Sequence, residues 1–341
     1  MASTTPSIEI YGIGNPLIDV IIKVNEKDLT NLNLVKGIMR LVDLDERRQI
    51  LKYFEGRQSA FGCGGSCPNT LIFLSSLGMR VAIAGKIGHD EFGKKYAENL
   101  PKKNLLSQLI YSDGPTGSSI ILVSPDSERT MNTYLGVNRQ FSKADIDFDV
   151  LKKANCLYFT GYMWDTQQQK ESIFKAIESV RSRGGIIAFD VADPFAVDRN
   201  RKAFIDLIEN KIDVVFANRE EAKLLYKVES AEDAAELLGN KVDIAVVKDG
   251  SRGSIIKRQG QSISKIPVRR VAAVDTTGAG DMYAAGFLYG LLKNFSDKDA
   301  GICASYLASR IVETWGAQFN PETRSVVAEE VKCGMWRFTD E

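Results

Sequence analysis

The 341-residue chain has an ordinary globular composition, with 44% hydrophobic and 26% charged residues. Its 44 Lys and Arg residues balance 44 Asp and Glu residues, which disfavours nucleic-acid binding because a phosphate backbone is held mainly by surplus positive charge. The single His excludes a His-rich metal site and argues against a Ser-His-Asp triad.

Short apolar runs alternate with amphipathic segments along the chain. The runs predict strands over residues 8–13, 81–87, 118–123, 156–160, 186–190, 214–217, 244–247 and 254–257. The amphipathic segments predict helices over 69–77, 168–183, 201–210, 219–226, 231–238, 282–293 and 299–313. This alternation is typical of βαβ units in a mainly parallel α/β sheet. No Pro/Gly/Ser-rich linker interrupts the chain, so we expect one domain over residues 1–341.

Two segments depart from the strand–helix rhythm. Residues 17–43 and 115–135 both alternate apolar and polar positions, and the second contains the turn-forming stretch SPDSE. We expect both segments to form antiparallel strands that leave the main sheet. Together they would make a small second sheet that acts as a lid.

The cysteines and the first residues bear on the cellular compartment. The five cysteines include no CxxC pair, and Cys63 and Cys67 lack the second ligand pair of a zinc site. Free thiols in a reducing compartment explain this pattern. The start MASTTPSIEI carries no signal-peptide features, and no apolar run reaches 18 residues. We therefore expect a cytoplasmic protein without membrane contact.

The clearest chemical motif is DTTGAGD, which ends at Asp281 and precedes a small-residue helix. Gly278 and Gly280 flank Ala279, so a ligand can approach the backbone closely. Free amides at a helix N-terminus form an anion site, and Asp281 beside that anion is placed to act as a general base. An Asp that stabilises an ordinary helix start explains the same spacing equally well.

Two glycine-containing segments predict an acceptor site. In GCGGSCPN, the pair Gly64-Gly65 lets amides touch a ligand, and Asn69 at a helix start can bind a hydroxyl. A glycine turn with Asn69 as N-cap is the simpler interpretation. In GIGNPLID, Asp19 follows the first strand, where α/β sheets bind ligands, although a surface Asp after a turn is common.

Three other segments bear on nucleotide binding. Residues 88–95 approach the Walker A spacing, but Lys95 stands where a hydroxyl is needed, so we reject a P-loop. Asn218 and Glu221 follow a strand and could organise the water shell of Mg²⁺, or simply form a charged helix start. The loop KDGSRG, from Lys248, is either a hairpin turn or a glycine-rich loop near a nucleotide.

The order of these motifs resembles the ribokinase (PfkB) family of carbohydrate and nucleoside kinases. The series GNPLID, GGSCPN, GxDxxG, NxxE, GSxG and DTTGAGD spans most of the chain, from Ile8 to Gly316, and within the family GNPLxD with GGS looks most like adenosine kinases. The resemblance implies a doubly wound, mainly parallel sheet with helices on both faces and a small β lid. It also implies transfer of the ATP γ-phosphate to a primary hydroxyl.

The resemblance assigns roles residue by residue. Asp281 is the expected catalytic base, and the amides of Gly278, Ala279 and Gly280 are the expected anion hole. Arg129, in the lid, is expected to reach the phosphates. The substrate-binding set that it implies comprises Asn15, Leu17, Asp19, Gly64, Gly65, Ser66, Asn69, Tyr162 and Arg129.

The nucleotide and ion sites follow in the same way. The expected ATP-binding set comprises Asn218, Glu221, Lys248, Gly250, Ser251, Gly253, Thr277, Gly278 and Gly280. Glu221 would serve Mg²⁺ through water. Asp275, with residues 311–316, matches the position where relatives bind a monovalent cation, which makes K⁺ a possible cofactor.

The acceptor itself is left open between adenosine, another nucleoside and a sugar. Tyr162 or Trp164 could stack on a base, but both also fit a protein core. Cys67 and Pro68 depart from the usual adenosine kinase pattern. A catalytically silent binding protein on this fold is a further alternative. A dehydrogenase is not, since Pro16 interrupts the glycine fingerprint that it requires. We expect adenosine as substrate in purine salvage, and a monomer or homodimer.

Overall fold

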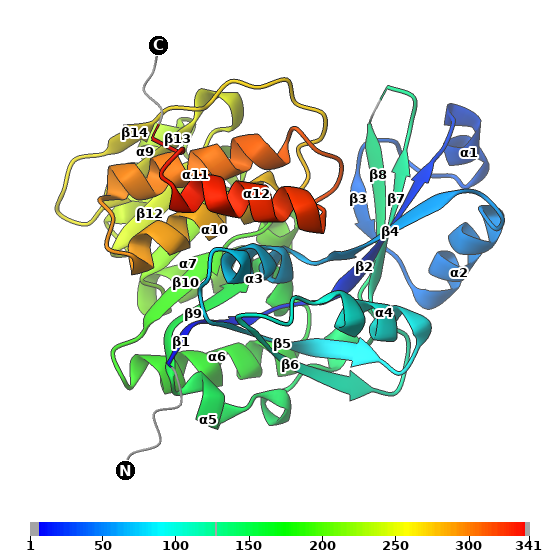
Figure 1. The fold of residues 1–341 in the computed structure, drawn as a ribbon, viewed down its shortest axis with the longest axis horizontal. Coiled ribbons are helices and arrows are strands. Elements are labelled where there is room, and N and C mark those ends of the chain that lie inside the picture. The colour runs from blue at the N-terminus through cyan, green and yellow to red at the C-terminus, as the bar shows by residue number, and fades with distance from the viewer. Residues whose placement is uncertain (1–6, 127, 338–341) are drawn as a thin grey trace.

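The computed structural model describes residues 7–126 and 128–337 and consists of two sheets with their covering helices (Figure 1). The larger sheet has the strand order β14-β13-β12-β11-β10-β9-β1-β5-β6. Its strands are β1 (Ile8–Ile13), β5 (Val81–Gly88), β6 (Leu105–Ser112), β9 (Ala154–Thr160), β10 (Ile186–Asp190), β11 (Val214–Asn218), β12 (Ile244–Lys248), β13 (Ser254–Arg258) and β14 (Ser264–Ile266). From β6 to β12 the neighbours pair in parallel, and β13 and β14 pair antiparallel.

Helices cover both faces of this sheet, as the strand–helix alternation predicted. Side chains along β1 alternate between the two faces, so Ile10 packs in one hydrophobic cluster and Tyr11 in the other. The first cluster takes in α3 (Ser66–Ser76), α10 (Ala279–Leu292), α11 (Asp297–Ile311) and α12 (Pro321–Lys332). The second takes in α5 (Phe148–Leu151), α6 (Gln167–Arg181), α7 (Pro194–Lys211), α8 (Arg219–Tyr226) and α9 (Ala231–Gly239). The predicted fold class is confirmed.

The smaller sheet is the lid (Figure 1). Its strand order is β3-β8-β7-β2-β4, with β2 (Leu17–Lys23), β3 (Met39–Leu41), β4 (Ser59–Gly64), β7 (Ser118–Val123) and β8 (Arg129–Tyr134). Apolar side chains on one face join a cluster with Leu29 of α1 (Glu26–Asn31) and Ile50 of α2 (Leu44–Tyr53). The other face is turned toward the main sheet.

The expectation of antiparallel strands over residues 17–43 was wrong in two respects. Helix α1 interrupts the segment, because Asn25 and Asp28 form a reciprocal capping box that starts a helix. Strand β2 pairs in parallel with β7, and β3 pairs in parallel with β8; only β2–β4 and β7–β8 are antiparallel. Strand partners far apart in the sequence decide this pattern, and alternation reveals only the faces. The lid also includes residues 44–64, which the prediction had left out.

The rejected P-loop segment forms helix α4 (Glu91–Asn99). The Asp90 carboxylate accepts the Gly93 amide and the Thr116 hydroxyl, as an N-cap that ties the helix to the segment leading into β7. Over residues 7–126 and 128–337, none of the helices is both long and apolar enough to cross a membrane.

Candidate active site

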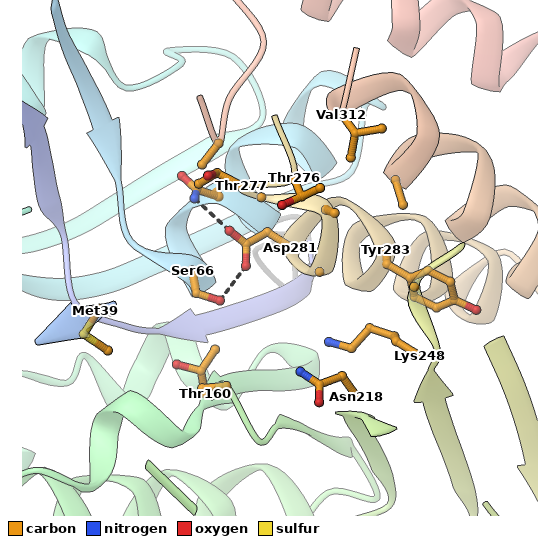
Figure 2. A pocket seen from close by; sticks show the side chains of 18 of the residues that line it. Met39, Ser66, Thr160, Asn218, Lys248, Thr276, Thr277, Asp281, Tyr283 and Val312 are labelled. Carbon is orange, nitrogen blue, oxygen red and sulfur yellow. Dashed lines mark hydrogen bonds between the residues drawn. The ribbon is translucent and has the colours of Figure 1, made fainter. Parts of the chain in front are cut away.

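A cavity of about 1020 Å³ lies between the main sheet, the lid and the first turn of α10 (Figure 2). Carboxyl ends of parallel strands are the usual ligand sites of α/β sheets. The main-sheet wall is formed by the ends of successive strands: Asn15 follows β1, Thr160 ends β9, Ala192 follows β10, Asn218 ends β11 and Lys248 ends β12. The cavity therefore joins residues that are more than 230 positions apart in the chain.

Asp281 is held between two side chains of α3. Ser66 Oγ donates to Oδ1 of Asp281 at 2.6 Å, and Asn69 Nδ2 donates to Oδ2 at 2.8 Å (Figure 2). Burial raises the pKa of Asp281 to about 6, and the bonds from Ser66 and Asn69 partly oppose this rise. A carboxylate with this pKa is ionised at neutral pH and remains a competent proton acceptor.

The backbone before Asp281 forms a turn that only glycine accommodates easily. Gly278 has φ 79°, and a Cβ placed there would lie 2.7 Å from the backbone of Ala317. Helix α10 begins at Ala279, so amides of its first turn lack acceptors inside the helix, and the residues of this turn line the cavity. The Ala279 amide does have an acceptor, the Thr276 carbonyl at 3.2 Å. Of the three predicted amides, those of Gly278 and Gly280 are therefore the better hydrogen-bond donors to an anion.

A charged cluster lies at the ends of β10, β11 and β12, beside the first turn of α10. Lys248 Nζ donates to Oδ2 of the buried Asp190 at 2.9 Å. Burial disfavours the charged form of Lys248, but the neighbouring Asp190 and Glu221 outweigh it and raise the pKa. Lys248 therefore places a positive charge at the wall of the cavity. Figure 2 shows its chain directed toward Asp281.

Glu221 and Asn218 are bound to one another at the start of α8. Glu221 Oε1 accepts from Asn218 Nδ2 at 2.6 Å, Oε2 accepts the Asn218 amide at 2.7 Å, and Asn218 Oδ1 accepts the Glu221 amide at 2.9 Å. Burial raises the pKa of Glu221. The described residues contain no group of three His, Cys, Asp or Glu side chains arranged to hold a metal. The residues present thus fit Mg²⁺ only if it is held through water and by the phosphates of ATP.

Arg129 reaches from lid strand β8 to the loop before α10. Its guanidinium donates to the Thr277 hydroxyl at 2.9 Å and forms an ion pair with the buried Asp275. The Asp275 carboxylate also accepts the amides of Thr277, at 3.0 Å, and Gly316, at 2.6 Å. Asp275, predicted as a ligand of a monovalent cation, thus already has a cationic partner in Arg129. Neither Arg129 nor Asp275 lines the cavity.

Asp19 and Asn69, both predicted to bind the acceptor, line the cavity, whereas Gly64 lies behind Asp19. Asp19 faces the cavity, and burial raises its pKa to about 7, with Arg129 opposing and Asp281 reinforcing the rise. Gly64 lies directly beneath Asp19, since a Cβ at Gly64 would lie 2.5 Å from Oδ1. Asn69 is occupied at both ends, by Asp281 and by Gln318 Nε2 at 2.8 Å. Asn69 therefore positions the Asp281 carboxylate and also lines the cavity.

Tyr162 and Trp164 take different positions. Tyr162 lines the cavity, and its carbonyl accepts from Asn15 Nδ2 at 3.1 Å. Trp164 is 2% exposed and stacks on Phe159 in the core. Tyr162 alone of the two is available to a ligand. The remaining predicted residues that line the same cavity are Leu17, Gly65, Ser66, Gly250, Ser251, Gly253 and Thr277.

Several participants had not been predicted. Asp190 ends a parallel strand, so the rule that drew attention to Asn218 could have found it. Of the apolar residues on the inward face of the lid, only Leu17 had been predicted. Leu17, Met39, Leu41, Ile121, Met131 and Leu135 form an apolar wall there, and Ser119 and Thr133 lie within it.

Comparisons with known proteins agree with this geometry. A model of the pfkB family carbohydrate kinases matches residues 31–324. The chain belongs to the PfkB family. A probable sugar kinase from Rhizobium etli CFN 42 matches this PfkB-family kinase with TM-score 0.88 and 31% identity, over 96% of this chain and 99% of its own. Adenosine kinase from Sinorhizobium meliloti matches with TM-score 0.87 and 31% identity, over 96% and 100%.

A nucleoside kinase from Methanothermobacter thermautotrophicus is 29% identical over 268 residues, which are 77% of this chain and 83% of the relative. Kinases of this family use ATP to phosphorylate a hydroxyl group of a sugar or nucleoside. The family resemblance drawn from the motifs is thus confirmed, and so is a phosphotransferase activity on an alcohol group.

Proposed function

We propose that this PfkB-family kinase phosphorylates the 5′-hydroxyl of a purine nucleoside such as adenosine, in preference to a free sugar. The observation that carries the proposal is the apolar wall of the lid, which lines the same cavity as Asp19 and Asp281. In that wall, Ile121 lies on the central strand β7, Met131 on β8 and Met39 on the edge strand β3. A bare sugar has no apolar face to bury there, whereas a purine buries a large flat surface.

The reaction uses groups at the first turn of α10. Asp281 accepts the proton of the acceptor hydroxyl as the hydroxyl oxygen attacks the γ-phosphorus, the bond from that phosphorus to the β,γ-bridging oxygen breaks, and ADP leaves. The amides of Gly278 and Gly280, with the charge of Lys248, stabilise the negative charge on the transferring phosphoryl group. Ser66 and Asn69 keep the Asp281 carboxylate oriented and ionised. Asp19 binds the sugar hydroxyls and so orients the acceptor.

Two ions belong to the proposal as well. Mg²⁺ supplies charge neutralisation to the ATP phosphates when it is bound, and Glu221 would contact it through water. A K⁺ ion at Asp275 would compete with Arg129, which forms an ion pair with that carboxylate. Activity measured with and without K⁺, at constant ionic strength, tests whether the cation is needed.

The deciding experiment compares acceptors under ATP-dependent conditions. Adenosine, ribose, fructose and 5-dehydro-2-deoxygluconate are assayed for kcat/KM, with product phosphate position assigned by NMR. We expect adenosine to exceed each sugar by at least tenfold and to be phosphorylated at the 5′-oxygen. A clear preference for one of the sugars would refute the nucleoside proposal and leave the kinase activity intact.

A further inference from the structure

The inward face of the lid carries one polar row across its strands. Asp19 on β2 pairs with Ser119 on β7, Ser119 pairs with Thr133 on β8, and Thr133 pairs with Leu41 on β3. All four residues line the cavity. Neighbouring strands are about 4.8 Å apart, so Ser119 and Thr133 lie about 5 and 10 Å from Asp19 along this row.

The adjacent row on the same face is entirely apolar. Ile121 pairs with Met131, and Met131 pairs with Met39. On the other side of Asp19 the register continues to Gly62, which has no side chain to bind a ligand. A ring attached to a ribose held at Asp19 therefore finds an apolar surface and two hydroxyls in one direction only, across β7 and β8.

The two hydroxyls are bonded to one another inside this apolar surround. Ser119 Oγ and Thr133 Oγ1 are 3.1 Å apart, and either oxygen can be the donor. Both side chains are more than nine-tenths buried. Each hydroxyl has one donor hydrogen and two lone pairs, so one hydrogen is used between them. The pair then presents one free donor and one adjacent acceptor toward the cavity.

We infer that Ser119 and Thr133 read the hydrogen-bonding edge of the purine and accept both 6-amino and 6-oxo bases; this rests on the proposed nucleoside kinase function. A 6-amino purine offers an N–H donor beside a ring-nitrogen acceptor, and a 6-oxo purine offers an oxygen acceptor beside a ring N–H donor. Reversing the direction of the Ser119–Thr133 bond exchanges which hydroxyl donates to the base. The same two side chains thus satisfy either edge with no buried polar group left unpaired.

The first test needs only the unaltered kinase. We expect kcat/KM for adenosine and inosine to agree within tenfold, because a rotating hydroxyl pair meets both edges equally. Discrimination of more than 100-fold between them would overturn the inference while leaving the nucleoside kinase proposal standing. Failure to phosphorylate either nucleoside would overturn the proposed function, and this inference with it.

The second test removes the hydroxyls at nearly constant volume. In the double variant Ser119→Ala, Thr133→Val, kcat/KM should fall about tenfold for adenosine and for inosine, as expected for lost neutral hydrogen bonds. Purine riboside, which lacks a C6 substituent, should lose clearly less, so the ratio of inosine to purine riboside falls. An unchanged ratio would contradict the assignment.

The matched control is Thr130→Val on the same strand. Thr130 lies on the opposite face of β8, where its hydroxyl accepts the Gly37 amide at 3.1 Å. The substitution removes one buried hydroxyl from the lid and leaves the cavity lining unchanged. The ratio of kcat/KM for inosine to that for purine riboside should therefore remain that of the unaltered kinase. A matching fall in this control would mean that lid stability, and not contact with the base, sets the ratio.

Discussion

The residues around Asp281 and Lys248, here called the corner, differ from the inward face of the lid in composition and in proposed role. The corner, around Asp281 and Lys248, consists of charged groups and backbone amides that are fixed by bonds to one another. The lid face consists of apolar side chains with one hydroxyl pair, and its side chains lie on four strands. In the function proposed above, the corner determines which reaction occurs, and the lid face determines which acceptor undergoes it.

This difference has a physical origin. Charge stabilisation in a transition state requires donors that are already oriented, which a helix start and strand ends supply. Recognition of a flat base requires apolar area and a small number of polar contacts, which a pleated sheet supplies on one face. Substitutions in the corner should therefore lower turnover for every acceptor, and substitutions in the lid face should change the relative preference between acceptors.

The largest expected effect is at Asp281. Asp281→Asn removes the proton acceptor while it keeps the size of the side chain, so kcat should fall about 10²–10⁴-fold for every acceptor. ATP affinity, measured by calorimetry, should change little. A variant with more than half of the original turnover would show that Asp281 is a helix-start residue and not the base.

The same variant should become more stable at alkaline pH. Burial raises the pKa of Asp281 from its ordinary value to about 6, so the folded protein holds this proton more tightly than the unfolded chain does. The ionised carboxylate therefore costs stability, fully above pH 6 and progressively less toward pH 4. The melting temperature of Asp281→Asn should exceed that of the unaltered protein at pH 8, with a smaller excess at pH 5.

The second prediction distinguishes a loss of phosphate binding at the anion hole from a loss of helix stability. A Cβ at Gly280 would lie 3.3 Å from Lys248 Nζ, the end of a flexible chain, so the fold should tolerate alanine. Ala favours a helix over Gly by up to about 1 kcal/mol. Gly280→Ala should therefore keep its melting temperature and lose about 10²-fold in turnover, on the scale of losing one donor to the developing charge.

Gly286→Ala in the same helix is the matched control. A Cβ there would lie 2.6 Å from Ala304 Cα, in the contact between α10 and α11. This variant should lose stability and keep its turnover per folded molecule. If Gly280→Ala behaved like Gly286→Ala, the glycines of the motif would serve packing and not phosphate binding.

The two regions also differ in how much of them the sequence reveals. Residues of the corner sit in short local motifs or at strand ends, so the sequence drew attention to Asn218, Lys248 and Asp281. Spacing alone left a purely structural role open for each, and the family resemblance supplied the functional one. Asp190 was equally accessible by that rule. What spacing did not reveal were the partners that each side chain takes, such as the bonds from Asn69 to Asp281 and Gln318.

The lid resisted prediction for a physical reason. Alternation along residues 115–135 identifies which side chains share a face, but the neighbour across the sheet depends on register. Ser119 meets Thr133 through the β7–β8 hairpin, and meets Asp19 through a parallel pairing across almost 100 residues. Helix α1 was recognisable from the Asn25–Asp28 spacing, a capping signal that the alternating pattern obscured.

The third effect is on pH dependence. The carboxylate form of Asp281 is the base, so kcat/KM should fall as the pH is lowered through about 6. Ser66→Ala removes a donor that stabilises this carboxylate, which should raise the Asp281 pKa and move the fall to higher pH, by on the order of one unit. Ser76→Ala, at the far end of the same helix, should leave the profile in place. An unchanged pH profile in Ser66→Ala would show that Ser66 does not set the pKa of Asp281.

The smallest effect is at the connection between the two regions. Arg129 links lid strand β8 to Asp275 and Thr277, immediately before the anion hole. Arg129→Ala should lower turnover about tenfold and change the KM for ATP less than threefold, because the guanidinium holds Thr277, which precedes the Gly278 amide proposed to meet the charge that develops in the transition state.

Hydrogen exchange distinguishes this role from simple support of the lid. Acceptor binding should protect residues 17–43 and 115–135 in the unaltered kinase before ATP is added, since the lid must exclude water from the γ-phosphate. Arg129→Ala should weaken that protection near β8 and raise the ratio of ATP hydrolysis to acceptor phosphorylation. Equal protection with and without acceptor would mean that the lid is a fixed wall, and that Arg129 positions the loop before α10 without any closing movement.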